Sequence, residues 1–347
     1  MNNIAVLGHF AYGHHKANGQ TIKTQEITTA LREHFGTKEV CTADTCGGWR
    51  FLLLLPIVAI RTLYRSHHIV IMPARKGILI IVPVFLFFNL LFRRTIHYVV
   101  IGGWLPSHAH RYPILCTLLR HLDHIYVETD MMKKSMDAMQ FTNTCIMPNC
   151  KMLDIIDDPI DNKQDCPPYL LCTFSRVIKE KGIEDAVSAV NKCNRRLGKV
   201  FFQLHIYGQV EQPEWFGTLM EKQPKEIQYK GIIAHSESTK VLKDYFALLF
   251  PTYYHGEAFA GTLIDALAAG LPVIASDWHA NPELVEPNKT GILFPVHSVE
   301  KLTDILFEIA HCPQMLTDMR DQCAKRAYNY LPETALRPLF HNIECPA

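Results

Sequence analysis

Short apolar runs alternate with helical patterns along the whole chain. Segments such as GIEDAVSAVNKCNRRLG and TKVLKDYFALL have the apolar spacing of amphipathic helices. The alternation of strands and helices predicts an α/β protein with parallel sheets and helices on both faces. The predicted strands are Ile4–Leu7, Ile69–Met72, Tyr98–Ile101, Ile125–Val127, Cys145–Met147, Tyr169–Phe174, Phe201–Tyr207, Ile227–Tyr229, Ala247–Phe250, Pro272–Ala275 and Gly291–Phe294.

The series of predicted elements breaks once, near the middle of the chain. The stretch DDPIDNKQDCPP, from Asp157 to Pro168, is polar and contains three prolines. A chain of 347 residues exceeds one ordinary domain and fits two. We therefore expect one Rossmann-like domain over residues 1–160 and a second over residues 168–330. Open parallel sheets bind ligands at the carboxyl ends of their strands, so candidate residues are sought there.

Composition excludes several classes of protein. Hydrophobic residues make up 48% of the sequence, charged residues 20%, and the formal net charge is +1. Nucleic-acid-binding proteins usually carry a strong basic excess, so nucleic acid is not an expected partner. The 11 cysteines contain no CxxC, and MNNIAVLGHFAYG lacks the order of a signal peptide. These features indicate reduced thiols and a cytoplasmic location.

Two apolar stretches leave two interpretations open. FLLLLPIVAI (Phe51–Ile60) lies between Arg50 and Arg61, and GILIIVPVFLFFNLLF (Gly77–Phe92) precedes Arg93-Arg94. A membrane-spanning helix needs about 20 apolar residues, which neither stretch has. Each stretch is either a buried helix or a helix that contacts a membrane face, with the flanking arginines on lipid phosphates. A membrane-spanning helix is the third and least favoured alternative.

Motifs for a metal or a dinucleotide are not evident. The 18 histidines contain no HExxH pattern, and Asp157-Asp158 lies in the polar linker and forms no DxD after a strand. Gly8 and Gly13 follow the first strand without GxGxxG spacing, which disfavours a dehydrogenase. We therefore expect no cofactor and no metal requirement.

The loop after the first strand is a candidate ligand-facing segment. NGQTIKTQEI contains Gly19, Gln20 and Thr21, and it predicts a turn that opens a helix capped by Thr21 or Thr24. Its backbone amides would then face an anion or polar hydroxyls. The alternative is a capped helix without a ligand.

A second candidate follows the third predicted strand, in IGGWLPSHAHR. Two glycines there permit close backbone approach. Trp104 would stack on a sugar face, and His108 or His110 would give or take a proton. A core tryptophan with a surface histidine pair is the alternative.

In the second half, two cations follow a buried strand. YLLCTFSRVIKEKG places Arg176 directly after the strand and Lys181 five residues further on. Two fixed cations at a strand end suit a diphosphate, although a solvated Lys/Glu-rich loop is the alternative. Gly208 and Gly231 end the next two predicted strands, where bare backbone lets a ring or a phosphate approach.

The stretch GEAFAGTLIDALAAGLP carries two acids eight positions apart, Glu257 and Asp265, around small residues. The pattern around them predicts a strand, a loop with Glu257, a turn, and a helix with Asp265. Two acids beside a turn can bind a ligand, or they can simply mark a helix start.

The two motifs together resemble the retaining glycosyltransferases of family 4, which have the GT-B fold of two Rossmann-like domains facing across a cleft. SRVIKEKG (Ser175–Gly182) is similar to the family pattern RxxxEKG. PTYYHGEAFAGTLIDALAAGLPVIAS (Pro251–Ser276) is similar to PSxxEGFGxxxxEAMAxGxPVVAS. The resemblance covers Leu170–Val296, and the first half matches only loosely. In this fold the terminal helix, here within residues 331–347, crosses back to the N-terminal domain.

The resemblance implies a role for each matching position. Arg176 and Lys181 would hold the donor's diphosphate, and Glu257 would accept hydrogen bonds from sugar hydroxyls. Lys230 to Ile232 would meet the base, and the amides from Phe259 to Thr262, at a helix N-terminus, would face the sugar and phosphates. Asp265 would bind the ribose from the first turn of that helix. The donor-binding set is Gly208, Lys230, Gly231, Ile232, Phe259, Ala260, Gly261, Thr262 and Asp265. The acceptor-side set is Gly19, Gln20, Thr21, Trp104, His108 and His110.

The chain departs from the family pattern at two positions. Asp265 stands where the family usually has Glu, which shortens the ribose contact by one methylene. EAFAG replaces EGFG, so Ala258 adds a side chain beside the sugar. The histidine that the family often has in its N-terminal domain has no clear counterpart, because GGW occupies that strand end.

The resemblance implies a glycosyltransferase that takes a nucleotide-diphosphate sugar, with a UDP-sugar favoured. Its acceptor would be a saccharide or a lipid-linked saccharide, used in polysaccharide or glycolipid synthesis at the cytoplasmic face of a bacterial membrane. Peripheral membrane contact is part of this hypothesis. The alternatives are an epimerase of the same fold, or a sugar-nucleotide-binding subunit without turnover.

Overall fold

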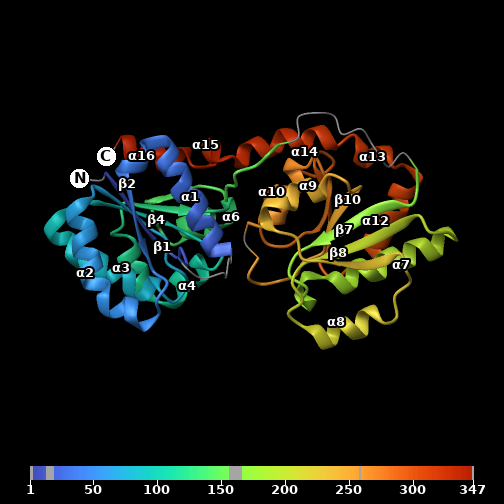
Figure 1. Ribbon diagram of the computed structural model, residues 1–347, viewed down its shortest axis with the longest axis horizontal. Helices are drawn as coiled ribbons and strands as arrows, with labels where there is room; N and C mark the ends of the chain where they lie inside the picture. Colours follow the sequence, from blue (N-terminus) through green and yellow to red (C-terminus); the bar gives the residue numbers. More distant parts are fainter. Residues whose placement is uncertain (1–2, 13–18, 156–165, 258, 346–347) are drawn as a thin grey trace. The chain divides into compact units, whose positions relative to one another are not determined.

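The computed structural model describes residues 3–12, 19–155, 166–257 and 259–345, and it has two compact units (Figure 1). Unit 1 comprises Met1–Met152 and Tyr330–Ala347, and unit 2 comprises Leu153–Asn329. Each unit contains a six-stranded parallel sheet with helices on both faces. The predicted α/β class is therefore confirmed.

In unit 1 the strand order is β2-β1-β3-β4-β5-β6. The strands are β1 (Ile4–Gly8), β2 (Val40–Asp44), β3 (His68–Ile71), β4 (Thr95–Val99), β5 (His124–Val127) and β6 (Thr144–Ile146). The helices are α1 (Gly19–Phe35), α2 (Trp49–Arg65), α3 (Ile78–Phe92), α4 (Leu105–Arg111), α5 (Pro113–Leu119), α6 (Asp130–Ala138), α15 (Pro332–Ala335) and α16 (Arg337–Glu344). Successive β1 residues face opposite sides: Ala5 packs in the core formed with α2 and α3, and Ile4 in the core formed with α1 and α16.

The end of the chain packs on unit 1, beside α1 (Figure 1). Apolar residues of α16 join the core that contains α1. At the rim, His34 Nε2 lies 2.7 Å from Glu344 Oε1, and the His34 ring stacks on Phe340. Asn342 Nδ2 donates to the Tyr126 hydroxyl at 2.9 Å. Apolar burial and these polar contacts together hold α16 on the sheet.

In unit 2 the strand order is β12-β11-β10-β7-β8-β9. The strands are β7 (Tyr169–Phe174), β8 (Phe202–Tyr207), β9 (Ile227–Gly231), β10 (Ala247–Phe250), β11 (Val273–Ser276) and β12 (Gly291–Phe294). The helices are α7 (Ile183–Leu197), α8 (Pro213–Met220), α9 (Ser238–Leu242), α10 (Gly261–Ala268), α11 (Asn281–Leu284), α12 (Val299–His311), α13 (Gln314–Thr317) and α14 (Arg320–Ala327). Helices α7 and α12 cover one face, and α9, α10 and α14 pack together on the other (Figure 1).

The strand prediction missed β2 and displaced β4. Strand β2 lies at the edge of its sheet, pairs only with β1, and has a single fully buried residue, Val40. An edge strand with one wet face lacks the apolar run that marks a central parallel strand. Strand β4 begins at Thr95, earlier than predicted, because the polar residue His97 is buried within the ladder.

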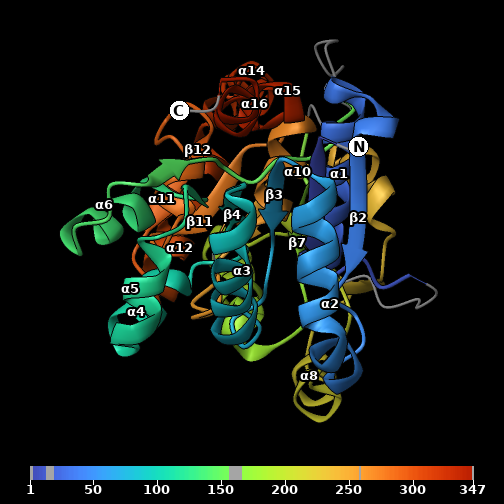
Figure 2. The same ribbon diagram turned by 90° about the vertical axis from the view of Figure 1, so that its left-hand side faces the viewer.

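Helices α2 and α3 lie side by side on unit 1 and are only half buried (Figure 2). Their inner residues, such as Leu55 and Phe85, enter the core of unit 1. The interpretation of both stretches as buried helices is therefore wrong for their outer side. We call that side the apolar face; its exposed residues are Trp49, Leu52, Leu53, Leu54, Ile57, Ile60, Tyr64, Leu79, Ile80, Phe87, Leu90 and Leu91. Among the described helices, none has the length and apolarity to cross a membrane.

Candidate active site

Two loops of unit 2 meet at the carboxyl ends of the neighbouring strands β7 and β10. The Tyr253 amide donates to the Glu180 carbonyl at 2.8 Å and ties one loop to the other. Gly182 has φ +69°, and a Cβ there would overlap the Pro251 carbonyl oxygen. Glycine therefore permits both the left-handed turn and the close approach of the two loops.

A buried ion pair joins these loops. Lys181 Nζ donates to Glu257 Oε2, and each residue is only 9% exposed. The same carboxylate oxygen accepts from the Thr252 hydroxyl at 3.0 Å. A buried charge that loses its partner is strongly destabilising, so the pair fixes the geometry of both loops. The structure thus brings together two residues singled out from separate sequence motifs.

Arg176 lies close to this pair and is linked to it through Tyr254. Its guanidinium is 5.0 Å from the centroid of the Tyr254 ring, and Lys181 Nζ is 5.3 Å from the same centroid. Its Nη1 lies 3.3 Å from Glu211 Oε2. Partial burial alone would lower the pKa of Arg176, but the hydrogen bond to Tyr254 and the Glu211 carboxylate raise it. Two cations, each paired with a carboxylate, therefore gather at one sheet edge.

Hydrogen bonds among three buried residues, Thr252, Ser276 and Asn281, support the position of Glu257. The Ser276 hydroxyl donates to the Thr252 carbonyl at 2.5 Å, and Asn281 Nδ2 donates to the Ser276 carbonyl at 3.0 Å. All three residues are buried. No sequence motif indicated Thr252, Tyr254 or Ser276, although each lies at or just after the end of β10 or β11. Their position at the carboxyl end of a strand is the signal that could have identified them.

The glycines at the ends of β8 and β9 have different surroundings. Gly208 has φ +134°, and a Cβ there would overlap the Ser175 carbonyl oxygen, so the neighbouring loop already requires glycine. Gly231 has φ +85° and open space on its Cβ side. Lys230 and Ile232 beside it are exposed. The backbone is therefore accessible at Gly231 but packed at Gly208.

The segment after Glu257 leads into α10. Ala258 lies outside the described residues, so the predicted effect of its side chain has no structural counterpart here. Phe259 and Ala260 are nearly buried, and α10 begins at Gly261 and includes Thr262. Asp265 is buried on the second turn of α10, not on its first turn as expected. Asp265 and the start of α10 therefore lie in the same region of unit 2.

On unit 1, the predicted loop before α1 is partly helical. Helix α1 already includes Gly19, so neither Thr21 nor Thr24 caps it, and that prediction is wrong. Thr21 is buried, and its hydroxyl lies 2.9 Å from His9 Nδ1. Gln20 Nε2 donates to the Met72 carbonyl at 3.4 Å. These side chains bind the protein itself at the carboxyl edge of the sheet.

Trp104 and His108 are held in the protein, whereas His110 is exposed. The Trp104 indole donates to the Ile101 carbonyl at 2.7 Å, and its ring meets the His108 ring edge-on. His108 is buried, so a surface histidine pair is excluded. Burial, followed by the charges of Arg75 and Arg111, lowers the pKa of His108. His110 retains solvent access at the end of α4.

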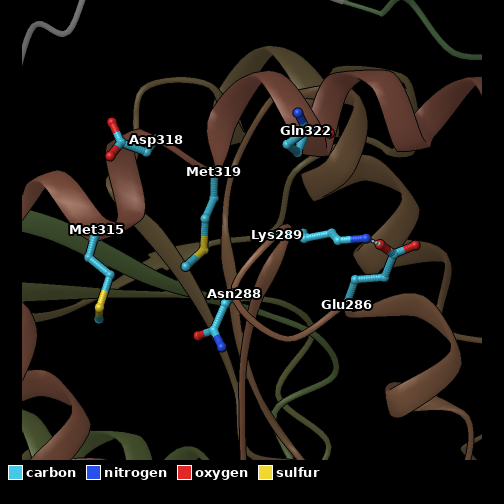
Figure 3. Close-up of a pocket in the computed structure, with 7 residues that line it drawn as sticks. All are labelled: Glu286, Asn288, Lys289, Met315, Asp318, Met319 and Gln322. Carbon is cyan, nitrogen blue, oxygen red and sulfur yellow. Dashed lines mark ion pairs between the residues drawn. The ribbon is translucent and has the colours of Figure 1, made fainter.

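Unit 2 also has a cavity of about 630 Å³ at the amino end of β12 (Figure 3). Its lining is Glu286, Asn288, Lys289, Met315, Asp318, Met319 and Gln322, and Lys289 pairs with Glu286 within it. The cluster around Lys181 follows the carboxyl ends of the strands, so this cavity lies at the opposite sheet edge. Its lining shares no residue with the described part of the predicted site.

Comparison with known proteins decides the family. The model of the glycosyl transferases group 1 family matches residues 156–330, which is half of the chain. The chain belongs to this family. The matched region includes both motifs that carry Arg176, Lys181 and Glu257, so the resemblance inferred from them is confirmed.

Several curated members of this group 1 family are similar to the chain. The GtfA subunit of a UDP-N-acetylglucosamine–peptide N-acetylglucosaminyltransferase from Streptococcus agalactiae is 29% identical over 47% of this chain and 31% of its own length. The colanic acid biosynthesis glycosyltransferase WcaL of Escherichia coli K12 is 26% identical over 48% of this chain and 41% of its own. The chain thus spans less than half the length of these relatives.

Solved structures share the fold of the whole chain. Anabaena HepE, solved in complex with UDP, superposes with a TM-score of 0.76 at 12% identity, over 99% of both chains. The lipopolysaccharide outer core galactosyltransferase WaaB superposes with a TM-score of 0.74 at 14% identity, over 99% of both chains. The chain therefore has the GT-B fold that the resemblance implied.

Proposed function

We propose that the protein is a retaining glycosyltransferase that moves a sugar from a nucleotide-diphosphate sugar to a saccharide or lipid-linked acceptor. The observation that carries this proposal is the buried Lys181–Glu257 pair beside Arg176, at the carboxyl edge of the sheet in unit 2. Membership of the glycosyl transferases group 1 family supports it. The retaining stereochemistry is proposed from the family resemblance.

In this proposal, Lys181 and Arg176 stabilise the leaving group. The bond between the anomeric carbon and the diphosphate oxygen breaks, and negative charge grows on the departing phosphate. Fixed cations aimed at growing charge lower the barrier because they need no reorganisation. Lys181 is fixed by burial and by Glu257, and Arg176 by Glu211 and the Tyr254 ring. Such cations perform this role without a metal ion in the proposed mechanism.

Glu257 and the start of α10 would bind the rest of the donor. A carboxylate that keeps free lone pairs beside Lys181 accepts hydrogen bonds from sugar hydroxyls. The amides at the start of α10 favour negative charge, which suits the sugar phosphates. We assign Asp265 to the ribose and the exposed backbone around Gly231 to the base. A UDP-sugar is favoured, in keeping with the names of the GtfA enzyme and of the HepE–UDP complex.

The acceptor would be an intermediate of cell-surface polysaccharide or glycolipid synthesis, in keeping with the colanic acid synthesis for which WcaL is named. We propose that unit 1 binds it near Gly19, Trp104 and His110. The apolar face of α2 and α3 would rest on the cytoplasmic side of a membrane. Exposed arginines accompany it, at positions 50, 61, 65 and 93. Apolar side chains with neighbouring arginines match the boundary between acyl chains and anionic headgroups.

The experiment that tests the proposed function begins with a screen of nucleotide sugars. UDP-glucose, UDP-N-acetylglucosamine and GDP-mannose are each tested for a rise in melting temperature, since a ligand stabilises the state it binds. Those that bind are then assayed for transfer to saccharide and lipid-linked acceptors, and the anomer of the product is determined by NMR. Binding with epimerised sugar, or binding without transfer to any acceptor, would favour the alternative functions.

A further inference from the structure

An aromatic cluster stands at the same edge of unit 2 and has no role in the functions assigned so far. Trp278 and His279 belong to the loop after β11, and His255 belongs to the loop after β10. The Trp278 ring lies 4.6 Å from the His279 ring at 87° and 5.4 Å from the His255 ring at 65°. The two imidazoles therefore meet the indole edge-on from two different loops.

One carbonyl oxygen connects this cluster to Glu257. The Trp278 indole N–H donates to the Tyr254 carbonyl at 3.0 Å. The Glu257 backbone amide donates to the same carbonyl at 3.0 Å. The orientation of the indole and the position of Glu257 are thus set by a single peptide group. Trp278 is therefore linked to the backbone of Glu257, whose carboxylate is assigned to the donor sugar.

Backbone hydrogen bonds also hold Trp278 in place. The Trp278 amide donates to the Ser276 carbonyl at 2.9 Å, and its own carbonyl accepts from the Asn281 amide at 3.0 Å. Asn281 is fully buried and also bonds to Ser276. A side chain held at both its backbone and its ring nitrogen has little freedom to reorient, as a binding surface requires.

His279 has a backbone conformation that residues other than glycine adopt infrequently. Its φ is +47°, in the left-handed region where a Cβ crowds the following carbonyl oxygen. His279 and His255 are exposed, while Trp278 is partly buried. An exposed side chain contributes little to packing, and residues in rare backbone conformations concentrate at functional sites.

We propose that Trp278, His255 and His279 form a wall of the donor-sugar subsite. The Trp278 ring takes the C–H face of the pyranose ring, because the negative face of an indole attracts polarised C–H groups. The two imidazoles exchange hydrogen bonds with hydroxyl or N-acyl groups of the same sugar. The ligand class is the pyranosyl group of a nucleotide sugar, with no contact to its base. This inference rests on the proposed function and names one part of its donor site.

The test compares binding of the sugar with binding of the nucleotide. Calorimetry gives Kd for UDP, UDP-glucose and UDP-N-acetylglucosamine, and for GDP and GDP-mannose, on the full chain. The sugar's share of the affinity is the ratio of the nucleotide Kd to the nucleotide-sugar Kd. Trp278→Leu is expected to reduce this ratio about tenfold, the effect of about 1.4 kcal/mol, and to leave the nucleotide Kd within about twofold. Trp278→Phe, which keeps an aromatic face, is expected to retain most of the ratio.

His279→Gly separates a functional role from a structural one. Glycine relieves the left-handed strain, so the melting temperature should stay the same or rise, while the ratio falls. Asn288→Gly is the matched control: Asn288 has φ +60° elsewhere in unit 2, and its replacement should leave the ratio unchanged. Unchanged ratios in both Trp278→Leu and His279→Gly would overturn the proposal. Wild-type protein that binds none of the nucleotides or nucleotide sugars would overturn the proposed function itself.

Discussion

Lys181 and Glu257, 76 positions apart in the chain, form an ion pair that is almost fully buried. Each comes from a loop after a different strand, and the loops interlock through Gly182 and Pro251. The ion pair therefore depends on the positions of both loops at the carboxyl ends of β7 and β10. A diphosphate bound there would offer Lys181 a second acceptor, while Glu257 would be free to bind hydroxyls.

Replacing Thr252 by Val tests the support of Glu257. The variant keeps the shape of the side chain and removes the hydroxyl that donates to the Glu257 carboxylate. We expect a loss of about 1–2 kcal/mol in the free energy of unfolding, and a kcat/KM lower by about tenfold. Thr303→Val, which removes a hydroxyl bond to the Val299 carbonyl within α12, should lower stability alone. Equal kcat/KM values for both variants would argue against a positioning role for Thr252.

Replacing Gly182 by Ala tests the interlock of the loops. Gly182 and Gly198 have nearly the same φ, +69° and +67°. Gly198 has open space around its Cβ position, so Gly198→Ala should cost about 1 kcal/mol of stability from backbone strain alone. Gly182→Ala also meets the Pro251 carbonyl and should cost clearly more, with loss of nucleotide-sugar binding. Chemical denaturation measures the free energy of unfolding of both variants. Similar losses in the two variants would mean that the contact between Gly182 and Pro251 does not hold the loops together.

The pattern of apolar runs predicted the central strands but missed an edge strand, and the start of α1 was also predicted wrongly. Central strands such as β1 and β10 are uniformly buried, so their apolar runs predicted them. Strand β2 is an edge strand, and the run VCTAD carries too little apolar signal. The caps at Thr21 and Thr24 were wrong because the helix already includes Gly19. Local patterns do not determine where a helix begins when tertiary contacts extend it.

Only the charged residues of the site could be predicted from the sequence. Arg176, Lys181 and Glu257 belong to motifs with recognisable spacing. Thr252 and Ser276 act through hydrogen bonds between loops that are 24 positions apart, and no spacing rule exposes such contacts. Trp278 is similar, because its link to Glu257 runs through the Tyr254 carbonyl.

A buried histidine cluster in unit 1 predicts an acid-sensitive fold. His97 Nε2 lies 3.1 Å from His68 Nδ1, and His97 stacks on His124. Burial lowers the pKa of all three below 6.5, most strongly for His97. The unfolded chain therefore binds more protons below about pH 6.5. The free energy of unfolding should be unaffected by this cluster above pH 6.5 and should fall progressively as the pH drops below it.

Denaturant titrations between pH 7.5 and 5 measure this dependence. His97→Gln should show a flatter dependence than the wild type, whereas the exposed control His121→Gln should reproduce the wild-type curve. Identical curves for wild type and His97→Gln would mean that the cluster does not titrate with unfolding.

The apolar face predicts binding to anionic lipid. Phe87, Leu90 and Leu91 are 66%, 75% and 79% exposed, so their joint replacement by Ser should leave the fold intact. Wild-type protein should float with vesicles that contain phosphatidylglycerol, less so in high salt, and the triple variant should remain at the bottom of the gradient. Val200→Ser, an exposed apolar position of unit 2, is the control. Wild-type protein that fails to float would end the membrane hypothesis.

The most direct test of the account is the rate of sugar transfer by Lys181→Ala and Arg176→Ala, measured with the nucleotide sugar found in the screen. Lys181→Ala should lower kcat by about 100-fold or more, and Arg176→Ala by about tenfold or more. Arg176 is half exposed, so its variant should fold normally; the exposed control Lys222→Ala should match the wild type. Circular dichroism confirms the fold of each. Wild-type kcat in a folded Lys181→Ala variant would contradict the assignment of this site to the donor diphosphate.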